Sequence, residues 1–219
     1  MSLEENYHAI KQSLPESIQL VAVSKTHPVE KIQTIYQLGQ RAFGENKVQE
    51  MIAKQPLLPA DIEWHLIGHL QTNKVKYIAP FVALIQSVDS KKLLQEINKQ
   101  AEKNQRIIPI LLQVKIAQED TKTGMDIAEA KALAEEISQG LYPHIALKGL
   151  MGIATFTDDE NTVQQEFLRL KNFYDELAPL YQLETLSMGM SHDFPLAIAC
   201  GANSVRIGSA IFGERDYSA

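Results

Sequence analysis

The chain of 219 residues is 45% hydrophobic and 22% charged, a globular balance that provides the core of one large domain. Its net charge of −6 argues against a nucleic-acid partner, and no apolar run approaches the roughly 18 residues of a membrane span. The single cysteine, Cys200, excludes an intramolecular disulfide framework, and the polar N-terminus does not resemble a signal peptide. We therefore expect a cytoplasmic protein that binds neither nucleic acid nor membrane.

Short β-rich runs alternate with helical patterns along the chain. The fifth run is apolar at consecutive positions in "IIPILLQV", which is typical of a strand covered on both faces. The eight predicted strands are Leu20–Ser24, Ala42–Glu45, Glu63–Ile67, Leu84–Val88, Ile108–Val114, Lys148–Ala154, Leu186–Met188 and Val205–Ile207.

The intervening segments carry helix signals. After the first strand, His27 is predicted to cap a helix whose first residue is Pro28. The sequence "TDDE" at Thr157–Glu160 is predicted to form a capping box. A helical stripe that faces the core is then expected at Val163, Phe167, Leu170, Phe173 and Leu177.

Eight strands that alternate with helices indicate an α/β fold with a parallel sheet, and eight such units close naturally into a single (β/α)8 TIM barrel over residues 1–219. An open doubly wound sheet is the competing topology, which the pattern does not exclude. In both topologies ligands bind at the carboxyl ends of the strands. The polar residues that directly follow the strands are therefore the candidate site residues.

Lys25 ends the first apolar run, just before Pro28 and a helical pattern. One interpretation is a surface lysine whose ammonium reaches solvent from the strand end. The other is a partly desolvated amine at the mouth of a barrel, where it is a nucleophile that condenses with an aldehyde to form a Schiff base. The position of Lys25 by itself slightly favours the surface interpretation.

Two turns near the C-terminus together indicate an anion site. In "GMSHD", Ser191 lies at a strand-to-helix turn where a hydroxyl and backbone N–H groups converge. In "RIGSAIFG", Gly208 allows close backbone approach and Ser209 adds a second hydroxyl. Phosphate sites in barrels are commonly built from the loops after strands seven and eight, where both turns fall. The alternative is that Ser191 only caps a helix and Gly208 only forms a turn.

Two further side chains have competing interpretations. Arg206 lies inside the last strand, where a buried guanidinium needs either a carboxylate or a ligand heteroatom as its partner. Asn46 and Gln49 resemble a helix cap with its return partner, which the residues favour over a catalytic role for Asn46. The pair His65 and His69 has metal-ligand spacing, but it spans a strand and its turn, so we predict no metal site.

A lysine on the first strand, a two-loop phosphate site and a buried arginine together suggest pyridoxal 5′-phosphate (PLP) as cofactor. At these residues the chain resembles the pyridoxal phosphate homeostasis proteins, the YggS/PROSC type. The matching segments run from Val21 to Gly213 and are "VAVSKTHP", "FGENKVQE", "WHLIGHLQTNK", "KTGM", "GLMGIAT" and "LSMGMSHDFPLAIACGANSVRIGSAIFG". The stretch before "VAVSK" looks short for the family, so we expect its first helix to be trimmed or displaced.

The resemblance implies a single barrel similar to the N-terminal domain of alanine racemase, with PLP bound covalently. It implies that Lys25 forms the Schiff base and that Arg206 faces the pyridine nitrogen. It assigns the phosphate to Ser191, Gly208 and Ser209. It also places Asn46 in the cofactor pocket, contrary to the capping interpretation.

Two functions remain open. In the first, the protein holds PLP and acts in intracellular vitamin B6 homeostasis, with apo PLP-dependent enzymes as recipients. In the second, it is a PLP-dependent amino-acid racemase. An arginine at the ring nitrogen disfavours racemisation, because it opposes ring protonation and weakens the electron sink. The tyrosines Tyr36, Tyr77, Tyr174 and Tyr217 offer no evident second acid or base. We therefore favour the homeostasis protein and expect a monomer. A cofactor-free sugar-phosphate enzyme is a third, weaker reading.

Overall fold

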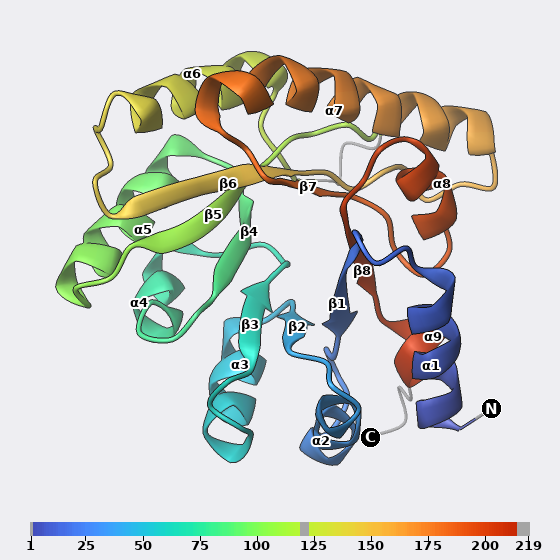
Figure 1. The fold of residues 1–219 in the computed structure, drawn as a ribbon. Helices are drawn as coiled ribbons and strands as arrows, with labels where there is room; N and C mark the ends of the chain where they lie inside the picture. Colours follow the sequence, from blue (N-terminus) through green and yellow to red (C-terminus); the bar gives the residue numbers. More distant parts are fainter. Residues whose placement is uncertain (1, 119–122, 214–219) are drawn as a thin grey trace.

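The fold is a closed barrel of eight parallel strands, paired in chain order from β1 to β8 and closed by β1 against β8 (Figure 1). The coordinates are a computed structural model, and residues 2–118 and 123–213 are described. The strands are β1 (Gln19–Val23), β2 (Ala42–Glu45), β3 (Glu63–Leu66), β4 (Leu84–Val88), β5 (Ile108–Gln113), β6 (Ile145–Met151), β7 (Thr185–Ser187) and β8 (Ser204–Ile207). The predicted TIM barrel is therefore confirmed, and the open doubly wound sheet is wrong.

Helices cover the outside of the barrel, with α6 and α7 lying across one side of it (Figure 1). The helices are α1 (Leu3–Ser13), α2 (Val29–Gln37), α3 (Val48–Lys54), α4 (Val75–Ile78), α5 (Lys91–Lys103), α6 (Ile127–Ser138), α7 (Glu160–Tyr181), α8 (Phe194–Ala199) and α9 (Ser209–Phe212), with short 3₁₀ turns η1 (Gln55–Leu57) and η2 (Thr72–Lys74). The segment that looked short still forms the 11-residue α1, which packs against α2 and α9.

The main core lies between the sheet and the surrounding helices. The five apolar residues predicted to face the core from the long helix are all buried on α7. Strand residues alternate between the two faces of the sheet, so Phe43 joins this outer core while Gly44 faces the barrel interior. A second, smaller cluster of Leu84, Leu111 and Met151 packs separately from the main core.

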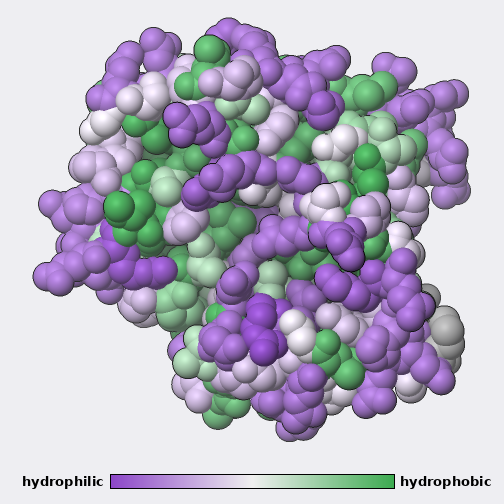
Figure 2. Space-filling model, in the orientation of Figure 1, coloured by the Kyte–Doolittle hydropathy of each residue, from purple (hydrophilic) through white to green (hydrophobic). Residues whose placement is uncertain are grey.

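The outer surface is mostly hydrophilic on the face seen in Figure 2, with separate hydrophobic patches between the polar side chains. Large exposed hydrophobic side chains, such as Leu57 and Leu141, come from different elements around the barrel. Within residues 2–118 and 123–213, no helix is both long enough and apolar enough to traverse a bilayer.

Five strands (β1, β3, β5, β7 and β8) differ from the predicted ranges by one residue at one or both ends, and β6 and the start of α2 also differ. Strand β6 runs over Ile145–Met151 rather than Lys148–Ala154, because its first residues pair with β5 although several of them are only half buried. Helix α2 begins after Pro28, which occupies the N-cap without a side-chain cap bond, so the predicted cap at His27 is wrong. The imidazole of His27 instead stacks on Phe212, with ring centroids 4.9 Å apart.

The predicted capping box at Thr157–Glu160 is also wrong. The N-cap of helix α7 is Asp159, two residues after Thr157, and its side chain accepts a hydrogen bond from Asn161 N. Thr157 Oγ1 accepts from Asp159 N at 3.2 Å and so shapes the loop before the helix. In "TDDE" both Thr157 and Asp159 carry a side-chain oxygen that can cap a helix, and Asp159, the one nearer the helix, is used.

Candidate functional site

A cavity of about 280 Å³ opens at the carboxyl end of the barrel. Its walls come from the segments that end or follow β1, β2, β3, β6, β7 and β8. All six predicted site residues line it: Lys25, Asn46, Ser191, Arg206, Gly208 and Ser209. The topology therefore brings residues from both ends of the chain to one place, because β1 and β8 are neighbours.

Lys25 lies two residues after the end of β1, on the wall of the cavity. Lys25 and Val23 are two residues apart, so their side chains point to the same side of the sheet, and both line the cavity. Lys25 is half buried. Ser24 continues the strand ladder by donating from its N–H to Gly44 O at 3.0 Å. The following residue, Thr26, has a φ of 66°, a left-handed conformation that is uncommon for a β-branched residue. Lys25 is thus presented to the cavity by a strand end that turns sharply.

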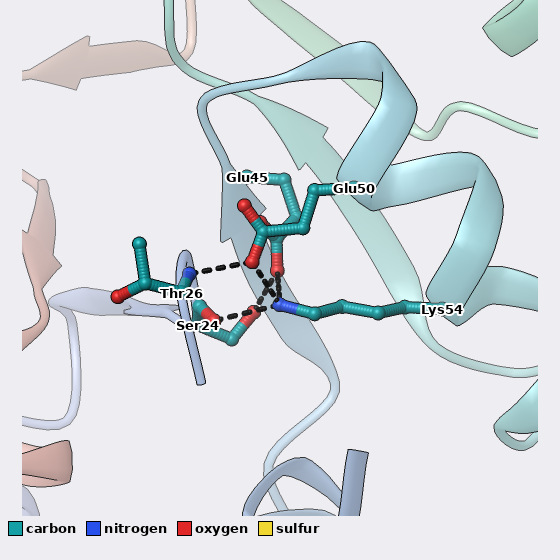
Figure 3. A network of polar contacts seen from close by, with 5 residues as sticks. All are labelled: Ser24, Thr26, Glu45, Glu50 and Lys54. Atoms are coloured by element: carbon teal, nitrogen blue, oxygen red, sulfur yellow. Dashed lines mark hydrogen bonds and ion pairs between the residues drawn. The ribbon is translucent and has the colours of Figure 1, made fainter. Parts of the chain in front are cut away.

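A group of charged side chains lies beside this turn, and we call Ser24, Glu45, Glu50 and Lys54 the ionic cluster (Figure 3). Lys54 Nζ donates to Glu45 Oε1 at 2.8 Å and to Glu50 Oε1 at 2.6 Å. Ser24 Oγ donates to the same Glu45 oxygen at 2.7 Å. None of the four residues is among those that line the cavity.

Burial raises the pKa of the Glu45 carboxyl to about 6, although the ammonium of Lys54 opposes this shift. The side chain of Glu45 is fully buried, whereas that of Glu50 is 21% exposed. Sequence analysis treated Glu45 only as a strand end and gave Lys54 no role. The spacing of Glu50 and Lys54 on one face of a short helix was the available signal.

The two C-terminal turns are joined through a hydroxyl. Ser191 Oγ accepts hydrogen bonds from Gly208 N at 3.2 Å and Ala210 N at 3.3 Å. A serine hydroxyl that accepts two bonds keeps its proton for donation to a third group. Gly208 lies close to β1, since a Cβ there would come within 3.3 Å of Val23 O. The hydroxyl-bearing residues Ser191 and Ser209 therefore line the same cavity as the main chain of Gly208, a combination that suits an anion.

Arg206 points from β8 into the barrel and reaches the cavity wall. Its guanidinium donates to Ser187 Oγ at 2.6 Å and to Gly152 O at 2.9 Å. The sequence left open a carboxylate as the partner of Arg206. Among the described residues, its guanidinium instead bonds a hydroxyl and a carbonyl oxygen. Burial lowers the pKa of Arg206 to about 10, and Asp193 opposes this shift. The group remains a cation at neutral pH, on the wall of the cavity.

A hydrogen-bonded chain continues from Arg206 across the inside of the barrel, and we call Arg206, Ser187, Gln86 and His65 the interior chain. Ser187 Oγ donates to Gln86 Oε1 at 2.7 Å, and Gln86 Nε2 lies 3.0 Å from His65 Nδ1. Burial lowers the pKa of His65 to about 4, so the imidazole is neutral at pH 7. Its Nδ1 accepts a hydrogen bond from the Gln86 amide, which fixes the orientation of that amide. The amide oxygen in turn fixes the direction of the Ser187 hydroxyl that contacts Arg206.

Asn46 does not cap a helix. Helix α3 begins at Val48 with Lys47 at its N-cap and no side-chain cap bond, so the predicted cap is wrong. Asn46 instead lines the cavity. Gly68 packs directly against it, because a Cβ at Gly68 would lie 2.4 Å from Asn46 O. A side chain at Gly68 would therefore clash with the main chain of Asn46.

Several cavity residues were not predicted from the sequence. His27, Phe156 and His192 all line the cavity, although His27 was predicted only as a helix cap and "GMSHD" only for its serine. Phe156 is 75% exposed and meets the His192 ring edge-on, with centroids 5.2 Å apart. These two rings form part of the cavity rim, and the hydropathy of a loop gives no signal for such a role.

His65 and His69, which have metal-ligand spacing in the sequence, lie in different surroundings. His65 belongs to the interior chain, whereas His69 is paired with Asp89 at 2.9 Å and its side chain is 56% exposed. Among residues 2–118 and 123–213, no group of three or more His, Cys, Asp or Glu side chains could hold a metal ion. Cys200 is buried, and burial raises its pKa, which is the setting of a packing residue rather than a nucleophile.

Comparison with known sequences gives consistent matches over the whole chain. Residues 1–216 match the family of alanine racemase N-terminal domains. A pyridoxal phosphate homeostasis protein from Pasteurella multocida is 42% identical over an alignment of 236 residues that covers 100% of both chains.

Comparison with solved structures agrees. PipY from Synechococcus elongatus, determined without PLP, superposes with a TM-score of 0.91 at 39% identity and covers 97% of this chain and 100% of its own. The form of PipY with PLP bound gives a TM-score of 0.86 at 38% identity. Alanine racemase from Bartonella henselae matches 99% of this chain over 60% of its own, with a TM-score of 0.74 at 17% identity, and so shares the fold.

Proposed function

The chain belongs to the pyridoxal phosphate homeostasis protein family, and we propose that it holds PLP as a Schiff base on Lys25 and acts in the homeostasis and delivery of this cofactor. The observation that carries the proposal is the convergence on one cavity of an amine, a set of anion donors and a buried guanidinium. The PLP-bound form of PipY, which has the same fold at 38% identity, supports PLP as the ligand.

Each part of PLP has a candidate partner in the cavity. We assign the phosphate to Ser191, Gly208 and Ser209, because all three line the cavity and the Ser191 hydroxyl, which accepts from Gly208 N, keeps its own proton for donation to an anion. We assign the ring to the space between these turns and Lys25, with Asn46 on its wall. When bound, PLP would supply an aldehyde, and the Lys25 amine would condense with it to form a C=N bond with loss of the carbonyl oxygen as water.

Arg206 is assigned to the pyridine nitrogen. With PLP bound, Arg206 would lie at that nitrogen, and its positive charge would oppose protonation of the ring. A ring without that proton withdraws electrons weakly and stabilises a substrate carbanion poorly. The arginine therefore favours a protein that holds and releases the cofactor over an efficient catalyst.

A racemase is the second candidate, and the placement of His192 on the cavity wall is the observation that favours it. Racemisation requires an acid or base on each face of the substrate carbon, and an imidazole could serve opposite Lys25. No tyrosine among residues 2–118 and 123–213 lines the cavity: Tyr36 donates to Asp61, and Tyr174 donates to Leu183 O. Tyr217 lies outside the described residues.

We further propose that the chain works in the cytoplasm as a monomeric, single PLP-binding domain over residues 1–219. Its lone cysteine suits a reducing compartment. The partners that follow from delivery are apo PLP-dependent enzymes.

The test is reduction with borohydride after loading with PLP. We expect one reduced pyridoxyl adduct, located on Lys25 by peptide mass spectrometry, because reduction converts the C=N bond into a stable amine. In Lys25→Ala the adduct and the Schiff-base absorbance should be lost, while weaker PLP binding through the phosphate turns persists. Lys31→Ala, on the exterior helix α2, is the matched control and should retain the adduct.

An adduct on another lysine, or none, would contradict the assignment of Lys25. Racemisation of a free amino acid at ordinary enzymatic rates, abolished in both Lys25→Ala and His192→Phe, would establish the racemase instead.

A further inference from the structure

The ionic cluster contacts the backbone on both sides of Lys25 (Figure 3). On the N-terminal side, Lys54 Nζ donates to Ser24 O at 2.9 Å. On the C-terminal side, Thr26 N donates to Glu50 Oε1 at 2.5 Å. Because Lys54 also bonds Glu50, the two contacts belong to one connected group of side chains.

The cluster approaches Lys25 from outside the barrel. Glu45 alternates with Gly44 on β2 and so projects toward α3, the helix that carries Glu50 and Lys54. Lys25 projects to the opposite side, where it lines the cavity. The cluster therefore holds the main chain of Lys25 without occupying the space of a ligand.

The backbone held in this way is strained. Thr26 has a φ of 66°, although its branched side chain disfavours the left-handed region. Such conformations persist where surrounding contacts over-determine them, and they occur often at functional sites. Here the N–H of Thr26 is bonded to a carboxylate that is itself held by a lysine. The bond opposes relaxation of Thr26 to an unstrained conformation, which would redirect the preceding side chain.

We propose that Glu50 and Lys54 are positioning residues: they hold the strained turn at Thr26 and thereby aim the amine of Lys25 into the cavity. This inference rests on the proposed attachment of PLP to Lys25. It assigns a role to residues that touch neither the cavity nor a ligand. The competing explanation is that the cluster only stabilises the packing of α3 on the barrel.

The first test compares two substitutions of Glu50. Glu50→Met keeps the length of the side chain but removes the acceptor for Thr26 N, and Lys54 keeps Glu45 as its counterion. Glu50→Gln keeps an oxygen acceptor at the same place. Glu136→Met is the matched control, because Glu136 pairs with Lys91 between α5 and α6 on another side of the barrel.

The measured quantity is the rate of covalent attachment of PLP, followed by borohydride quenching and intact mass at subsaturating PLP, with thermal melting of each apo protein alongside. We expect Glu50→Met to attach PLP roughly 10- to 100-fold more slowly, because misplacing a nucleophile by about 1 Å has effects of this size. Glu50→Gln and Glu136→Met should stay near the wild-type rate. A wild-type rate in Glu50→Met would overturn the proposal.

The second test separates positioning from stability by rescue. Thr26→Gly removes the steric penalty of the left-handed conformation, so the turn needs less external support. We expect Glu50→Met with Thr26→Gly to recover part of the attachment rate without a matching gain in melting temperature. A rate that instead follows melting temperature across all variants would support the purely stabilising role and overturn the proposal.

A third measurement needs no variant. Thr26 is exposed, so its amide hydrogen should exchange rapidly unless the bond to Glu50 protects it. We expect slow exchange at Thr26 in the wild-type apo protein, and exchange at the rate of a free amide would overturn the proposal. Absence of any wild-type adduct on Lys25 would instead refute the proposed function, so the two failures are distinguishable.

Discussion

The interior chain and the ionic cluster are both buried polar groups beside the same cavity, but they manage charge in opposite ways. The interior chain carries one cation, Arg206, at its cavity end and continues through a hydroxyl, an amide and a neutral imidazole. The ionic cluster brings an ammonium and two carboxylates into direct contact. The guanidinium of Arg206 is held by neutral hydrogen-bond acceptors, so its charge stays available to a ligand. The charge of Lys54 is instead neutralised by carboxylates of the protein.

This difference suggests that the two groups have different roles. A guanidinium held by a hydroxyl and a carbonyl keeps its full charge, because neither partner neutralises it. A lysine between two carboxylates contributes little field at a distance, but it ties together the elements that carry its partners. The interior chain is therefore suited to recognition, and the ionic cluster to positioning. Three experiments test whether the interior chain and the ionic cluster differ in this way.

Removal of the central cation of the ionic cluster should have the largest effect on stability. Lys54→Met leaves the fully buried Glu45 without its counterion, with the repelling carboxylate of Glu50 still nearby. We expect a loss of about 3–5 kcal/mol in the free energy of unfolding, the range for one partner removed from a buried ion pair. Urea denaturation at pH 7.5 measures it. Lys131→Met, which breaks the exposed pair with Glu176, should have a much smaller effect. Equal losses in the two variants would show that the cluster is not effectively buried.

Acid should weaken the interior chain. The pKa of His65 is about 4 in the folded protein, below its ordinary value of 6.5, so the unfolded chain binds a proton more readily. The stability conferred by neutral His65 is complete above pH 6.5 and is lost as pH falls through 4, by about 3 kcal/mol in total. Urea denaturation from pH 7.5 to 4 should show this loss in the wild type, and it should be smaller in His65→Gln. A parallel pH dependence in both proteins would contradict a neutral buried imidazole.

The ionic cluster should respond to pH with the opposite sign and a smaller amplitude. The pKa of Glu45 is about 6 in the folded protein, above its ordinary value of 4.5, because burial disfavours the carboxylate. Its contribution to stability is complete below pH 4.5 and is lost as pH rises through 6, by about 2 kcal/mol. The stability of Glu45→Gln relative to wild type should therefore increase by this amount between pH 4.5 and 7.5, measured by urea denaturation. A constant difference would place the Glu45 carboxylate in a more polar setting.

The parts of the site that sequence analysis located are those that depend on strand order. Lys25, Arg206 and Gly208 each lie in or directly after a strand, so the predicted barrel placed them at one edge without knowledge of distances. The ionic cluster was missed because its contacts depend on how α3 packs against β1 and β2. A lysine such as Lys54 in a helical pattern is usually a solvated residue.

The errors have a common physical origin. The beginning of β6 is only half buried, so hydropathy placed that strand three residues too late. The caps predicted at His27 and Asn46 relied on residue type, whereas tertiary contacts, stacking on Phe212 and the wall of the cavity, determine where these side chains lie. Local propensity identifies where a helix begins to within a few residues, but it does not state what a side chain at that point contacts.

The pairing of β1 with β8 also affects when the site can form during synthesis. The ribosome makes Lys25 early, whereas Gly208 and Ser209 come from the last described strand and helix. A nascent chain that has not yet released β8 has the amine but only part of the cavity wall. Complete assembly of the pocket therefore requires β8 to have emerged and paired with β1, so a free aldehyde meets the finished binding site only after the barrel has closed.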